Sequence, residues 1–135
     1  MHSTAVAHPA TVAAVVKFLA HAGAAFYVFD HFIWKPYKAG DLHGFTHKLK
    51  IAEAALAALF VYHEVKVMAG DVKDSKLLSF LATPITAAIA KLSALKSDIT
   101  GGHLSALNNV QSDLGAIKAQ SNAKGYVIKE ITHSI

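Results

Sequence analysis

The chain contains no cysteine and no arginine. Without cysteine it has no disulfide, no thiolate nucleophile and no cysteine-ligated zinc or iron–sulfur centre. All 13 basic residues are lysines, which are scattered along the sequence and contribute to a net charge of +4. In nucleic-acid-binding proteins the planar guanidinium group of arginine usually binds the phosphates and the edges of guanine bases. Since the chain has no arginine, nucleic-acid binding is disfavoured.

Long uninterrupted apolar runs are also missing. Lys17, His21 and Asp30 interrupt the first hydrophobic stretch, and Glu53 and Glu64 interrupt the second. A membrane span needs about 18 or more consecutive apolar residues, so no span is expected. The N-terminus has no basic leader before its apolar stretch and does not resemble a signal peptide. A secreted protein whose leader had been removed would also begin in this way, so the compartment stays open.

Charged residues make up only 16% of the chain, whereas hydrophobic residues make up 53%. Globular domains average roughly 25% charged residues. The 135 residues suffice for one domain with its own core, and no linker divides them, so we expect a single helical domain over 1–135. The apolar excess predicts that the extra surface is covered in a homo-oligomer, buried around a ligand, or in contact with a membrane.

Helical periodicity and turn residues predict an all-α fold of four helices, at about 9–34, 42–69, 75–99 and 103–124. Pro36 is expected to stop the first helix, and Asp41 to cap the second. Helices of similar length joined by short turns favour an antiparallel up-and-down four-helix bundle. Two helical hairpins that pair across a dimer are the alternative.

The second half of the chain carries an apolar seam whose residues are spaced alternately three and four apart, as in coiled-coil packing. It comprises Leu78, Leu81, Ile85, Ala88, Leu92, Leu95 and Ile99, and continues in Leu107, Val110, Leu114 and Ile117. Folding about residues 100–102 pairs the two halves of the seam as a helical hairpin. Pro84 is expected to kink the third helix.

The second helix has two apolar faces, which predicts a central position or an oligomer contact. One face holds His43, His47, Ile51, Ala54, Ala58, Val61 and Val65, and the other holds Phe45, Leu49, Leu56, Phe60, His63 and Val67. His63 is expected to meet the third and fourth helices as a buried, hydrogen-bonded histidine. His21 falls on a polar stripe of the first helix and is expected to be solvated.

Residues 29–50 gather most of the residues suited to ligand binding. Asp30 falls on an apolar helix face, where a carboxylate needs a partner. A hairpin that turns near Lys38 would place Asp30 level with His47. His43 and His47, four residues apart, share one helix face and could bind a common metal. Asp30, His43 and His47 are therefore the predicted metal ligands, and an Asp30–His47 hydrogen bond that only fixes the hairpin is the alternative.

Several aromatic side chains surround these residues and favour haem over zinc or copper. The aromatic group consists of Phe26, Phe29, Phe32, Trp34, Tyr37 and Phe45. Haem needs an axial histidine within an apolar slot, and the predicted cofactor-binding residues are His31, His43, His47 and His63. Paired Glu-x-x-His motifs are absent, which disfavours a di-iron centre.

Catalysis is disfavoured, because the chain has no G-x-S-x-G, P-loop or dinucleotide-binding motif. The sequence therefore predicts a small helical protein that binds haem or a transition metal. The alternatives are a self-associating helical interaction protein and a binder of lipid or another apolar ligand without a metal.

Overall fold

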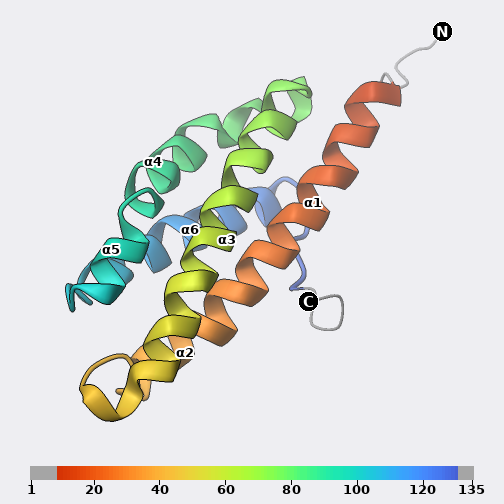
Figure 1. The fold of residues 1–135 in the computed structure, drawn as a ribbon. Helices are drawn as coiled ribbons and strands as arrows, with labels where there is room; N and C mark the ends of the chain where they lie inside the picture. Colours follow the sequence, from red (N-terminus) through yellow and green to blue (C-terminus); the bar gives the residue numbers. More distant parts are fainter. Residues whose placement is uncertain (1–8, 131–135) are drawn as a thin grey trace, which may run out of the picture.

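The protein is all-helical over the residues that the structure describes (Figure 1). The structure is a computed structural model that describes residues 9–130, except for the side chains of residues 9–11 and of Phe45. No strand occurs within 9–130, so the predicted all-α class is confirmed there. The predictions for the aromatic ring of Phe45 and for residues 131–135 lie outside the described part.

The helical elements follow one another with short connections. They are α1 (Pro9–Phe29), a π-helical turn (Asp30–Trp34), α2 (Lys35–Lys38), a 3-10 turn (Phe45–His47), α3 (Lys48–Lys73), a 3-10 segment (Lys76–Leu81), α4 (Ala82–Leu92), α5 (Leu95–Thr100) and α6 (Ala106–Ala123). α3 packs against α1, α4 and α5, and α4 packs against α6. In Figure 1, α1 and α3 run side by side in opposite directions.

The first helix does not stop at Pro36 as predicted. The π turn carries the chain directly from α1 into α2, and the backbone N–H of Lys35 donates to the carbonyl of Asp30, five residues earlier. A proline inside an α-helix lacks the N–H and clashes with the carbonyl four residues before it. The wider π turn accommodates Pro36 just after it. The helical segment formed by α1, the π turn and α2, which we call the rod, therefore continues to Lys38.

The second helix begins later and ends later than the predicted 42–69. α3 starts at Lys48 and has no side-chain cap, so the predicted capping role of Asp41 is wrong. Gly40 and Gly44 adopt φ values of +80° and +90° in the preceding connection, which keeps residues 40–44 out of a helix. The helix continues through Gly70 to Lys73, since Asp71 and Val72 are buried on its core side.

The third predicted helix, 75–99, is divided into a 3-10 segment and two α-helices. Pro84 lies in the first turn of α4, where no intrahelical partner for its N–H is required. The change from 3-10 to α-helix, at Leu81 and Ala82, directly precedes this proline. A second break falls at residues 93–94, between α4 and α5. Ser93 Oγ donates to the carbonyl of Ala90 at 2.8 Å, a local bond that competes with the helical ladder.

The apolar seam is confirmed as the core of the second half. All eleven of its residues are buried, from Leu78 in the 3-10 segment to Ile117 in α6. The segment after α6 closes this core, because Ile128 is buried and its backbone N–H donates to Asn122 Oδ1 at 2.9 Å. The ring of Tyr126 stacks on Phe80 at 6.4 Å between centroids. Residues 126–130 therefore form a non-helical strap over this core.

One segment meets the length and hydropathy of a membrane-spanning helix. Val12–Lys38 has a mean hydropathy of 1.7 in its most apolar window, and 44% of that window is buried inside the protein. Core helices that pack within a protein also satisfy this criterion, so length and composition alone do not assign the segment to a membrane.

Replacing Leu92 by Ala should lower the free energy of unfolding by about 2–5 kcal/mol, because Leu92 is buried in the seam and a cavity would remain. Leu77 is 43% exposed and provides the control. Leu77→Ala should change stability by much less, since surface substitutions usually stay within about 0.5 kcal/mol. Urea unfolding followed by circular dichroism measures both variants, and equal losses would contradict the assignment of the core.

Candidate functional site

The connection of residues 39–47 holds two of the predicted ligand histidines. Nδ1 of His47 lies 2.8 Å from the carbonyl oxygen of His43. A carbonyl only accepts hydrogen bonds, so Nδ1 of His47 is the donor in this contact. Nε2 lies 3.5 Å from Oδ1 of Asp41. His43 is exposed, and His47 is partly exposed.

Asp30 and His47 are not brought together. Oδ2 of Asp30 lies 3.5 Å from Nζ of Lys35, one turn further along the same rod. Asp30 also lines a small cavity of about 90 Å³ between α1, α6 and the C-terminal strap, with Gln111, Lys118 and Glu130 among the lining residues. These polar neighbours explain how a carboxylate is accommodated on a face that is otherwise apolar. The predicted contact between Asp30 and His47 across the hairpin does not form.

His31 and His63 also stand apart from the connection. His31 is exposed, stacks on Tyr27 at 5.2 Å between ring centroids and meets Phe32 edge-on at 4.8 Å. His63 is exposed on α3, so the prediction that it meets the third and fourth helices is wrong. Within residues 9–130, no three His, Asp or Glu side chains are grouped so that they could hold a metal ion.

A pocket of about 420 Å³ opens beside the same connection. Its lining comes from Leu42, Gly44, Lys48 and Ile51 on one side and from Ile99, Thr100, Gly101 and Gly102 on the other. The pocket therefore lies between the start of α3 and the turn after α5. Its isoleucines give it an apolar floor. His43 and His47 lie in the neighbouring connection and are not among the lining residues.

The pair His21–Asp71 is a buried polar contact that sequence reasoning missed. Nδ1 of His21 in α1 lies 2.8 Å from Oδ2 of Asp71 in α3, and the Asp71 side chain is only 9% exposed. The prediction that His21 is simply solvated is therefore wrong. The sequence could have predicted the burial of Asp71 from its helical spacing relative to Val65, Met68 and Val72. This spacing places Asp71 on the core face of α3 if the helix continues past Gly70.

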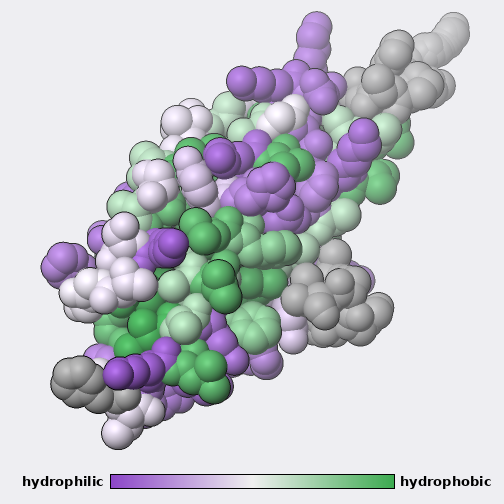
Figure 2. Space-filling view, in the orientation of Figure 1, coloured by the Kyte–Doolittle hydropathy of each residue, from purple (hydrophilic) through white to green (hydrophobic). Residues whose placement is uncertain are grey.

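One face of α3 is left uncovered, and we call it the free face. It consists of Leu49, Glu53, Leu56, Phe60, His63 and Val67. Leu49 is 75% exposed and Leu56 68%, although the opposite face, with Ala54, Ala58 and Val61, is fully buried. Figure 2 shows apolar side chains gathered over the middle of the molecule, where α3 and α1 lie side by side, with hydrophilic side chains among them and toward the upper end of α3.

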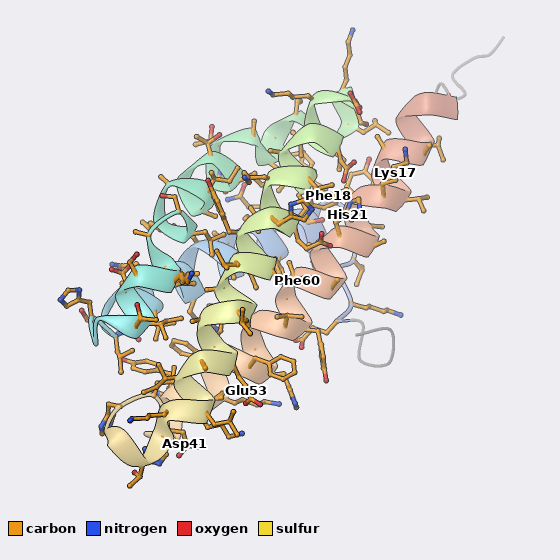
Figure 3. All side chains as sticks on the ribbon, viewed as in Figure 1. Lys17, Phe18, His21, Asp41, Glu53 and Phe60 are labelled. Carbon is orange, nitrogen blue, oxygen red and sulfur yellow. The ribbon has the colours of Figure 1, made fainter. Side chains whose placement is uncertain are left out.

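A shallow apolar groove runs between the free face and α1. It has a volume of about 290 Å³ and is lined by Val28, Phe32, Glu53, Leu56, Ala57 and Phe60. Figure 3 labels Glu53 and Phe60 on α3 beside this groove. Glu53 is its only charged lining residue, so the groove suits an apolar side chain that inserts beside a carboxylate.

No protein family, curated protein or solved structure matches this chain.

Replacing His21 by Ala should lower the free energy of unfolding by about 1–3 kcal/mol, because the buried Asp71 carboxylate would lose its hydrogen-bond donor. The double variant His21→Ala, Asp71→Ala should recover part of the loss, since no unpaired carboxylate remains. Thermal and urea unfolding measure the coupling. His31→Ala, at an exposed position, is the control, and a strictly additive double variant would contradict the role of the pair.

Proposed function

We propose that this chain is an antiparallel four-helix-bundle protein that associates with a second copy of itself through the free face of α3. The observation that carries the proposal is the exposure of Leu49, Leu56 and Phe60 on a helix whose opposite face is buried. Single exposed leucines are ordinary on protein surfaces, whereas a contiguous apolar patch marks an interaction site. An interaction protein thus fits the geometry better than a metal protein.

The spacing on the free face supports a helical partner. Its six residues are separated by 4, 3, 4, 3 and 4 positions, which is the repeat that keeps two packed helices in contact. From Leu49 to Val67 the face extends for about 27 Å along α3. A second copy would supply an apolar surface of the same length, and mutual coverage accounts for the high apolar content of the chain.

A second candidate function is ligand binding at the connection of residues 39–47. The hydrogen bond from His47 Nδ1 to the His43 carbonyl favours it, because metal-ligating histidines usually donate their other ring N–H to such an acceptor. The adjacent pocket of about 420 Å³ lies within the size range of small-molecule sites. Haem, or a divalent metal such as zinc or copper, would then bind through Nε2 of His47 with help from His43.

Replacing Leu56 by Lys should weaken self-association at least about tenfold, because a charge would be desolvated at the centre of the interface. Leu77→Lys is the matched control, since Leu77 is also an exposed leucine but lies outside the free face. Sedimentation velocity over a range of concentrations gives both dissociation constants. A parent protein that stays monomeric throughout would refute the proposal.

The double variant His43→Ala, His47→Ala should abolish any haem or divalent-metal binding that the parent shows, because it removes both imidazoles of the connection. Haem titration followed by absorption spectroscopy tests haem, and isothermal titration tests zinc and copper. His63→Ala, on the free face, should bind as the parent does. If the double variant binds like the parent, this candidate function is wrong.

A further inference from the structure

The inference concerns how two copies fit together and rests on the proposed self-association. We infer that the two α3 helices pair antiparallel about a two-fold axis level with residue 58, so that Glu53 of each copy faces His63 of the other. The free face is then self-complementary, as an interface with two-fold symmetry requires.

The positions of the polar residues on the free face define this alignment. Glu53 and His63 lie five residues before and after position 58. Antiparallel pairing about that position places Leu56 next to Phe60 of the second copy. At the ends of the interface, Leu49 meets Val67 of the second copy. Every apolar residue of the face therefore meets an apolar residue, and each carboxylate meets an imidazole.

Other alignments of the same two faces are less favourable. Parallel pairing would set Glu53 against Glu53 and His63 against His63, which places like groups together. An antiparallel shift by one heptad would set Glu53 against Leu56 of the second copy, or His63 against Phe60. A carboxylate that packs on an apolar side chain loses water without gaining a partner, so these alignments cost free energy. The arrangement centred on residue 58 avoids both mismatches.

The residues beside the free face agree with this alignment. In antiparallel helix pairs, equivalent flanking positions of the two helices meet across the interface. On one flank Lys50 lies within reach of Glu64 of the second copy, an attractive pair. On the other flank Leu59, which is 43% exposed, meets Leu59 of the second copy near the two-fold axis. The groove beside Phe32 and Ala57 is placed to receive Leu56 of the second copy.

A charge exchange tests the alignment. His63→Glu should raise the dissociation constant of the dimer about tenfold, because the introduced carboxylate would face Glu53 of the second copy twice per dimer. Adding Glu53→Lys should restore the constant to within about threefold of the parent, since each pair is again opposite in charge. His63→Glu, Asp74→Lys carries the same net charge, and its lysine at the exposed position 74 lies outside the face, so it should not be rescued.

Cross-linking gives an independent test, because the chain has no cysteine of its own. Oxidised Glu53→Cys, His63→Cys should form a covalent dimer on a non-reducing gel. Positions 53 and 63 of one helix are about 15 Å apart, too far for a disulfide within one copy. Glu53→Cys alone should stay monomeric on the gel, because residue 53 of one copy lies about 15 Å along the axis from residue 53 of the other.

The outcomes separate the alignment from the proposed function. If Glu53→Lys restores the dissociation constant and the 53–63 disulfide forms, the results support both the alignment and self-association. A dimer that Leu56→Lys weakens, but that shows neither rescue nor the 53–63 disulfide, overturns the alignment and leaves self-association standing. A monomeric parent overturns both. A monomer that sediments with vesicles of phosphatidylcholine and phosphatidylglycerol also overturns both, and assigns the free face to a lipid surface.

Discussion

The pairing of α1 with α3 is the contact on which the rest of the molecule depends. α3 packs against α1, α4 and α5, and its packing against α1 is the most extensive of these contacts. The His21–Asp71 bond joins α1 to the far end of α3, and the two residues are separated by 50 positions in sequence. Because Asp71 is buried and needs its partner, this bond fixes the rotation of α3 about its own axis. That rotation decides which apolar face is covered and which is left free.

The seam and the faces were predictable because they depend on periodicity alone. A spacing of three and four places Ile85 and Leu92 on one side of any helix, whatever breaks occur between them. The two faces of α3 were found in the same way. Which of the two faces is buried depends on the position of α1, and the sequence of α3 alone does not determine it. The helix ends were predicted less well, because Pro36 and Pro84 have different effects according to their position within a turn.

The predicted pairing of Asp30 with His47 did not form, for a related reason. Asp30 was assigned to His47 by assuming a hairpin that turns near Lys38 with uniform helical geometry. The π turn changes the phase of the rod at Asp30, and the carboxylate faces Lys35 and the cavity beside α6 instead. His47 finds a closer carboxylate in Asp41, within its own connection. Polar contacts of this kind depend on single turns, and composition and spacing do not specify them.

The π turn also sets how the rest of the first helical segment is oriented relative to α1. A π turn is closed by a hydrogen bond between residues five apart, so it holds about one residue more than an α turn. Deleting one residue between Asp30 and Trp34 would restore regular geometry, but it would place the ring of Pro36 against a backbone carbonyl. It would also rotate Trp34 and Tyr37, which contact one another at 5.5 Å, by about 100° relative to α1. The length of the turn and the proline are therefore coupled, and deleting one residue of the turn should be tolerated better when Pro36 is replaced as well.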